Sequence, residues 1–218
     1  MIHRCLKDHV QASLQREFGV EPLPETTALY RWLPHFYAGP RYAFDRFSLF
    51  DLNPSGLFAT DRVQGSGGGV VSGPALVMMV DRRNNIYYPS QGLWTELVLF
   101  RNLESFGGTG SFSRIAFDFS KYFSFHRKNI IAVNYYTIFS PDELPFYQMG
   151  MLGGIKKMRG FYEGRFRDNN AILFQAEYRR WIKGIFGFTV FGSAGQVADR
   201  YTKFHHDFWK FTYGAGLR

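Results

Sequence analysis

The sequence predicts an all-β fold, an antiparallel β-barrel that spans a membrane, and three observations support this prediction. From about Glu25 onward, aromatic and β-branched runs are separated by clusters of glycine, proline, asparagine and aspartate, as in strands joined by turns. Within these runs apolar and polar residues alternate, so that each strand has one apolar and one polar face. The runs reach about 10 to 14 residues, which exceeds the roughly five or six of soluble sheets and suffices for a tilted membrane-spanning strand.

The composition agrees with a lipid-facing β surface. Aromatic residues make up 19% of the 218 residues, and transmembrane barrels carry girdles of such rings. No run of roughly 20 apolar residues occurs, which excludes a helical membrane protein. The formal net charge is +8, from basic residues that are mostly scattered. The single cysteine, Cys5, excludes an internal disulfide and argues against a cysteine-based metal site.

The alternation is clearest at 111–125, where Ile115 and Phe117 share one face and Arg114 and Asp118 the other. Residues 1–24 are expected to be irregular or weakly helical, and 25–218 to form the barrel. The other expected strands are 27–37, 42–51, 70–81, 92–102, 129–139, 169–181, 184–197 and a last run from Trp209 to Leu217. A period of two also fits a soluble barrel or sandwich whose apolar faces point inward, so the pattern leaves both orientations open.

One segment with a dense set of glycines and basic residues suggests a family. Residues 153–168 read Gly-Gly-Ile-Lys-Lys-Met-Arg-Gly-Phe-Tyr-Glu-Gly-Arg-Phe-Arg-Asp. This resembles the signature loop of the outer-membrane assembly family, the BamA/TamA-like bacterial surface antigens. The family pattern is Gly-Gly, a spacer, a hydrophobic residue, Arg-Gly-Phe/Tyr, and a Gly-Arg-Phe/Tyr-Arg-Asp-like stretch before the next strand. The matching residues are Met158, Arg159, Gly160, Phe161, Gly164, Arg165 and Asp168.

A second segment resembles a turn of the same family. Residues 81–92 read Asp-Arg-Arg-Asn-Asn-Ile-Tyr-Tyr-Pro-Ser-Gln-Gly, similar to the family's Asp-x-Arg-Asp/Asn-Asn…Pro-x-x-Gly turn between two barrel strands. The residues of this turn motif are Asp81, Arg83, Asn84, Asn85, Pro89 and Gly92. Asparagine, proline and glycine are also sound turn residues in themselves. The resemblance covers 69–218, which includes both motifs in the family's order.

The resemblance implies that the loop folds back into the barrel lumen, where Arg159 reaches acidic residues of the inner wall. Alternation places Glu177 on the lumen face, so Arg159–Glu177 is the expected pair, and a guanidinium suits a carboxylate. Gly160 would permit a tight turn and Phe161 would pack among interior side chains. An exposed hairpin with a solvated Arg159 is the alternative. Ser193 stands where the family often has aspartate, so we expect Glu177 and Ser193 as inner-wall partners, only one of them acidic.

Other groups of residues give weaker evidence for a functional site. His205, His206 and Asp207 resemble a metal cluster, but neighbours on a strand point to opposite faces, which favours a polar turn. The basic and aromatic run 156–167 matches the barrel loop, which argues against nucleic-acid binding. No Ser/His/Asp order, Gly-x-Ser-x-Gly or HExxH motif occurs. We therefore expect no enzyme activity, no metal and no cofactor.

The resemblance implies a sixteen-stranded barrel, of which the chain holds about ten or eleven strands. The start lacks a secretory signal and the end falls in mid-strand, so we expect a piece of a longer protein without the C-terminal strands. The implied function is assembly, insertion or translocation of proteins at the bacterial outer membrane. The implied partners are outer-membrane lipids, unfolded outer-membrane polypeptides or a fused passenger, and other assembly subunits. A passive pore or surface antigen, and a soluble β-barrel binding protein, are the alternatives.

Overall fold

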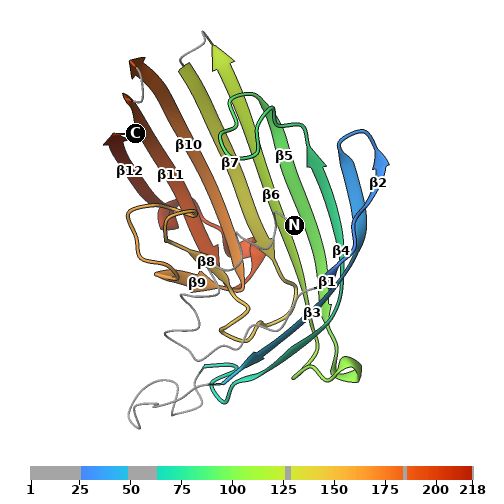
Figure 1. Ribbon diagram of the computed structural model, residues 1–218. Coiled ribbons are helices and arrows are strands. Elements are labelled where there is room, and N and C mark those ends of the chain that lie inside the picture. The colour runs from blue at the N-terminus through green and yellow to red at the C-terminus, as the bar shows by residue number, and fades with distance from the viewer. Residues whose placement is uncertain (1–25, 49–62, 126–128, 184–185, 218) are drawn as a thin grey trace.

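The wall of the molecule is one curved antiparallel sheet (Figure 1). A computed structural model of the chain describes residues 26–48, 63–125, 129–183 and 186–217, and every structural statement concerns these ranges. Within them the sheet has ten strands in the order β1-β3-β4-β5-β6-β7-β10-β11-β12, with β2 paired to β3. The all-β antiparallel prediction is confirmed. In this part of the chain β1 and β12 form the two edges, so the sheet is an open part of a barrel. The expected N-terminal segment 1–24 and Cys5 lie outside the described ranges.

The wall consists mainly of long strands, and the remaining elements are short strands and 3-10 helices. The long strands are β3 (Phe36–Phe47), β4 (Gly69–Asp81), β5 (Gly92–Asn102), β6 (Phe112–Phe125), β7 (Asn129–Phe139), β10 (Asn170–Lys183), β11 (Phe186–Ala198) and β12 (Lys210–Leu217). The short strands are β1 (Thr26–Thr27), β2 (Tyr30–Leu33), β8 (Gly150–Leu152) and β9 (Phe166–Asp168), and the 3-10 helices are η1 (Glu104–Phe106), η2 (Tyr201–Lys203) and η3 (His206–Phe208). None of the described helices is long and apolar enough to cross a membrane.

The prediction of two strands at 27–37 and 42–51 is wrong. The chain turns earlier, after β2, where His35 adopts a positive φ of 67°, and β3 then runs unbroken through Gly39 and Pro40. A Cβ atom on Gly39 would lie 1.9 Å from the carbonyl oxygen of Ala28, so glycine is needed for close approach and not for a turn. Proline is tolerated in strands near a sheet edge. Positions 49–51 lie outside the described ranges.

The outer face of the sheet carries a continuous apolar row. Phe119, Tyr135, Phe174, Ala194 and Phe211 lie opposite one another on β6, β7, β10, β11 and β12. Side chains paired in this way share one face of the sheet. Phe174 and Phe211 are 49% and 70% exposed, and the rings of Tyr135 and Phe174 are 4.8 Å apart. This face suits hydrocarbon, not water.

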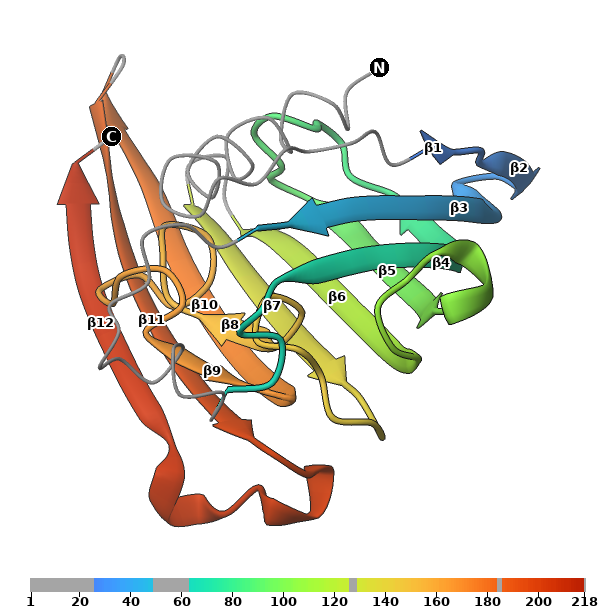
Figure 2. The same ribbon diagram turned by 90° about the horizontal axis from the view of Figure 1, so that it is seen from below.

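The next row along the strands is polar and faces the interior. Ser120, Asn134, Gln175, Ser193 and Thr212 are aligned on the same five strands. Asn134 donates to Ser120 and Gln175 donates to Asn134, at 3.1 and 3.2 Å. Gln175 also bonds to the segment that contains β8 and β9, which lies inside the curve of the sheet (Figure 2). The apolar faces therefore point outward, as in a barrel in lipid, whereas a soluble barrel requires the reverse.

The cores lie between the wall and the segments folded inside it. In one core cluster Leu152 and Met158 of the inward segment are fully buried against Leu173 of β10 and Tyr136 of β7. A second cluster joins Leu144 to the inner faces of β3 to β6. The inward segment is thus part of the packed structure, because its apolar side chains are buried by the wall and bury the wall in turn.

The two faces of β6 should respond differently to charge. Phe119 faces lipid at the middle of β6, whereas Tyr122 lines an interior cavity beside Arg159 and Glu177. We predict that Phe119→Lys lowers the free energy of unfolding in lipid vesicles by about 2–4 kcal/mol. Tyr122→Lys, the control on the same strand, should lower it by less than about 1 kcal/mol, since water can reach the lumen. Urea unfolding followed by tryptophan fluorescence measures both, and equal losses would contradict the assigned faces.

Candidate functional site

The candidate site is the loop that joins β7 to β10 and folds into the barrel. The side chains of two asparagines at the start of β10 fasten the first part of the loop. The backbone N–H of Leu144 donates to Oδ1 of Asn169 at 2.9 Å, and that of Ser140 to Oδ1 of Asn170 at 3.0 Å. Between these anchors β8 and β9 pair in a small separate sheet on the inside of the wall (Figure 2). The expected inward-folded position of the loop is what the structure has.

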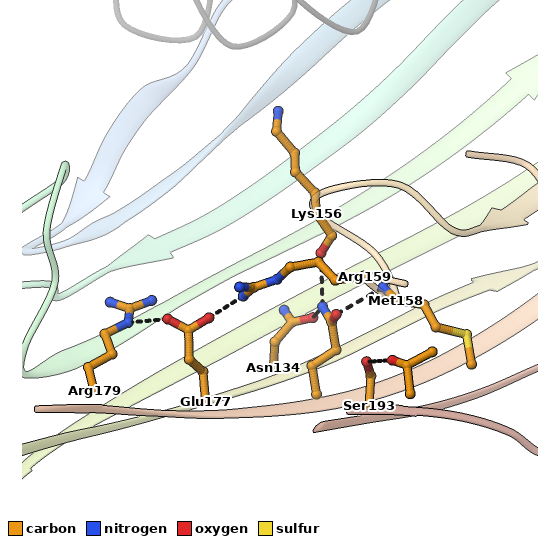
Figure 3. A network of polar contacts seen from close by, with 9 residues as sticks. Asn134, Lys156, Met158, Arg159, Glu177, Arg179 and Ser193 are labelled. Atoms are coloured by element: carbon orange, nitrogen blue, oxygen red, sulfur yellow. Dashed lines mark hydrogen bonds and ion pairs between the residues drawn. The ribbon is translucent and has the colours of Figure 1, made fainter. Parts of the chain in front are cut away.

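Gln175 of β10 binds the backbone of the loop tip at two residues, Lys156 and Met158, which Figure 3 labels. Its Oε1 accepts from the N–H of Met158 at 2.9 Å, and its Nε2 donates to the carbonyl oxygen of Lys156 at 3.0 Å. Met158 adopts a positive φ of 68° and its side chain is fully buried. The Nζ of Lys157 lies 3.4 Å from the centre of the Tyr136 ring. The tip is therefore held in one backbone conformation by the wall.

The charged centre of the site is Glu177 on β10. Arg159 from the loop donates to Oε2 of Glu177, and Nε of Arg179 donates to Oε1 at 2.5 Å (Figure 3). The guanidinium of Arg159 also lies 4.3 Å from the centre of the Phe191 ring. Glu177 is 8% exposed, and an ionised carboxylate at such a position needs opposite charge close by. The structure thus pairs the two residues that the sequence suggested, and adds a second arginine.

Ser193 faces the lumen but does not take the place of a second partner for Arg159. Its hydroxyl is 2.7 Å from the hydroxyl of Thr212 on β12, and this bond joins two wall strands (Figure 3). Ser193 lies on the inner wall beside the loop and lines the same cavity as Arg159 and Glu177, but its hydroxyl is bonded to Thr212. A serine hydroxyl is shorter than an aspartate side chain and finds a neighbour within the wall. The face of the Phe191 ring lies against the guanidinium instead.

The other loop residues divide into those that pack at the tip and those that face away from it. Gly160 adopts a φ of 110°, and the Phe161 ring packs against the core cluster of Leu152 and Met158 and edge-on to Phe166 at 4.8 Å. Gly164 has a φ of 72° and turns the chain toward β9. These residues give the tip its shape, as the motif suggested.

Arg165 and Asp168 do not reach the charged centre. Arg165 is exposed and donates to the hydroxyl of Tyr162 at 2.9 Å. Asp168 ends β9 and accepts from the N–H of Asn169 at 2.8 Å. Burial raises the pKa of the Asp168 carboxyl above its ordinary value. Both residues belong to the hairpin that carries the tip.

Sequence reasoning missed a glycine that makes room for the loop. A Cβ atom on Gly195 of β11 would lie 2.8 Å from Cδ1 of Leu152 and 3.2 Å from Sδ of Met158. The available signal was a glycine in the interior of an expected strand, which often marks a close approach of another segment. Arg179 was also missed, although it lies two residues after Glu177 on the same strand and therefore on the same face.

The turn motif, residues 81–92, joins β4 to β5 and is held together by its own hydrogen bonds. Arg83 donates to both carboxylate oxygens of Asp81, at 2.9 and 2.6 Å. Oδ1 of Asn84 accepts from the backbone N–H groups of Ser90 and Gln91, both at 3.0 Å. These bonds close the base of the turn.

The tip of the turn is fixed by the remaining motif residues. Oδ1 of Asn85 accepts from the N–H groups of Tyr87 and Tyr88, at 2.8 and 2.9 Å. Pro89 is buried, and Gly92 has a φ of 103° where the carbonyl oxygen of Arg82 lies 2.0 Å from the position of a Cβ atom. The turn is thus a rigid unit, consistent with the motif.

His205, His206 and Asp207 lie close together because they are not on a strand, but the cluster lacks the features of a built metal site. These residues lie in a loop and η3, not on a strand, and their ligand atoms all lie within 4.8 Å of one another. All three are exposed. Metal-bound histidines normally have their second ring nitrogen held by a further group, and no other side chain or backbone group of the described ranges bonds to these rings.

A lipid-facing wall with a loop docked in its lumen defines a barrel protein of the outer-membrane type. The model of the Omp85 superfamily domain matches residues 76–218, and the chain belongs to this superfamily. No curated protein matches the sequence. Membership of this superfamily implies a location in the bacterial outer membrane.

Two solved structures have a fold similar to that of this chain. One is BamA from Haemophilus ducreyi lacking POTRA domains 1–3, with a TM-score of 0.59 and 17% identity, over 84% of this chain and 44% of that one. The other is CdiB from Acinetobacter baumannii, with a TM-score of 0.57 and 17% identity, over 84% of this chain and 32% of that one. The chain spans less than half the length of either, and these identities establish the fold alone.

The contact at Gly195 gives a direct test of loop docking. We predict that Gly195→Val displaces the loop, because the added atoms overlap Leu152 and Met158, and lowers the free energy of unfolding by about 1–3 kcal/mol. Trypsin should then cleave faster after Lys156 and Lys157 at the tip. The control is Gly192→Ala, whose Cβ would meet no atom closer than 3.7 Å. Wild-type cleavage of the Gly195→Val protein would show that the loop does not need this space.

Proposed function

We propose that the chain is barrel wall and lumen loop of an outer-membrane protein that assembles, inserts or translocates other proteins. The observation that supports this most is the charge-paired docking of the Arg159 tip against Glu177. A passive pore would need only a polar lumen, whereas this Omp85 superfamily wall also holds a docked loop. Its contacts are ion pairs, hydrogen bonds and packing, so it acts by position and not by making covalent bonds.

The proposed partners follow from the surfaces. The apolar outer row, which includes Phe174 and Phe211, contacts outer-membrane lipids. Clients are unfolded outer-membrane polypeptides or a fused passenger, and other subunits of an assembly machinery complete the system. No nucleic acid is a partner in this proposal, since Lys157, Arg159 and Arg167 of the basic run 156–167 are used in contacts inside the barrel. In this mechanism the docked tip braces the wall while a client enters the membrane.

A second candidate function is a passive pore or surface antigen that keeps the fold without assembly activity. Ser193 favours it, because the site has one acidic residue where the family often has two, and Ser193 is bonded to Thr212. Single-channel recording in planar bilayers would reveal a stable conductance. Conductance without any effect on client insertion supports the pore.

The test uses the natural full-length protein that contains these residues, reconstituted in lipid vesicles with an unfolded outer-membrane barrel protein as client. We predict that Arg159→Ala slows client insertion by about tenfold, because it removes one partner of the covered Glu177 carboxylate, a loss on the order of 1–3 kcal/mol. Arg165→Ala is the matched control, since Arg165 is an exposed arginine of the same loop. Insertion is followed by protease protection of the client. Equal rates for wild type and Arg159→Ala would refute an active role of the docked loop.

A further inference from the structure

The turn between β4 and β5 reaches across the inside of the wall to β10. In the sheet, β5 and β10 are separated by β6 and β7, so strand pairing alone does not bring the turn to β10. Figure 1 shows the turn lying over these intervening strands. The side chains confirm the contact, because Tyr88 of the turn lies with Arg179, Trp181 and Phe188 around one small cavity.

Tyr88 contacts the arginine that shares Glu177. The guanidinium carbon of Arg179 is 5.5 Å from the centre of the Tyr88 ring, within the range of a cation–π contact. Tyr88 also packs against the ring of Trp181, with the ring centres 5.7 Å apart. The backbone of Tyr88 is in turn held by Asn85 at 2.9 Å. The ring is therefore a fixed surface against which the guanidinium rests.

The same arginine determines how Glu177 is presented to the loop. Arg179 donates from Nε to Oε1 of Glu177, which leaves Oε2 for Arg159. One carboxylate oxygen thus serves each arginine. A guanidinium is planar and donates in fixed directions, so a shift of Arg179 would turn the carboxylate and displace Oε2 from Arg159.

We propose that Tyr88 is a positioning residue for the lumen loop: through Arg179 it orients Glu177 toward Arg159, so that the turn motif and the loop motif form one network. The path runs from the ring of Tyr88 to Arg179, then to Glu177 and Arg159, without a gap. The turn thereby governs how firmly the loop is docked. This inference deepens the proposed function and rests on it for its biological meaning, whereas the docking itself can be measured without any client.

Thiol labelling at the loop tip measures the docking directly. In a Cys5→Ser background, which removes the single native cysteine, Met158→Cys places a thiol where the side chain is fully buried. A small water-soluble maleimide then reacts at a rate set by how often the tip leaves the wall. The protein is kept in membranes of the expressing cells, and heat-modifiable gel mobility establishes that each variant has folded.

Tyr88→Ala should raise the labelling rate about fivefold to thirtyfold, the factor that corresponds to a desolvated cation–π contact. Tyr88→Phe keeps the ring and should label within about twofold of the parent. Tyr87→Ala is the matched control, because Tyr87 is the adjacent tyrosine and is 85% exposed. If Tyr88→Ala does not fold, Arg179→Lys takes its place, since lysine keeps the charge and loses the fork.

Measurements in the Arg159→Ala background show whether Tyr88 acts through Arg159 or whether its removal loosens the loop in some other way. Arg159→Ala alone should raise the labelling rate, and adding Tyr88→Ala should raise it no further, because the network is already broken at its end. A parent-like rate for Tyr88→Ala, or an equal increase with and without Arg159, would overturn the proposal. If this labelling pattern is found but Arg159→Ala leaves client insertion unchanged, the proposed function is refuted and the positioning role of Tyr88 still holds.

Discussion

The carboxylate of Glu177 is the constraint on which the site depends. It projects into the interior from β10 and is almost fully covered, and a buried carboxylate without opposite charge is costly. Arg179 of the same strand supplies one guanidinium, and the loop must fold inward to supply the other. A buried charge that loses its partner is more costly than an ion pair replaced as a whole by apolar residues. Removing either arginine is therefore expected to be destabilising, because the Glu177 carboxylate then keeps only one positive charge beside it.

The rest of the site makes the inward position of Arg159 possible. Gln175 takes up the polar backbone groups beside the tip, and Gly195 leaves space for Leu152 and Met158. These apolar side chains then form a core with the wall, so burial of apolar surface and charge pairing favour the same loop conformation. The strand register fixes all of these contacts at once, because a slip by one residue would turn every one of these side chains to the lipid face.

Sequence periodicity predicted which side chains share a face of each strand, but it did not predict the contacts across the lumen. A period of two placed Gln175 and Glu177 on one face, and the resemblance of 153–168 to a known loop supplied Arg159 as a partner. Alternation does not say which face is concave, so the choice between lipid and a soluble core needed the structure. The expected break between 37 and 42 falls at Gly39 and Pro40, but both residues lie inside β3, where the chain just after β1 approaches Gly39 closely. Tyr88 and Arg179 are neighbours only because the sheet curves, which no local pattern records.

The most direct measurement is a double-mutant cycle on Arg159 and Glu177. The free energies of unfolding in lipid vesicles would be measured for the wild type, Arg159→Ala, Glu177→Gln and the double variant. If the loop is held by this pair, each single change is destabilising and the double variant loses less than the sum, with a coupling energy of about 1.5 kcal/mol or more. Additive losses within about 0.5 kcal/mol would show that the two groups are near each other without holding the loop, and would contradict the docking mechanism.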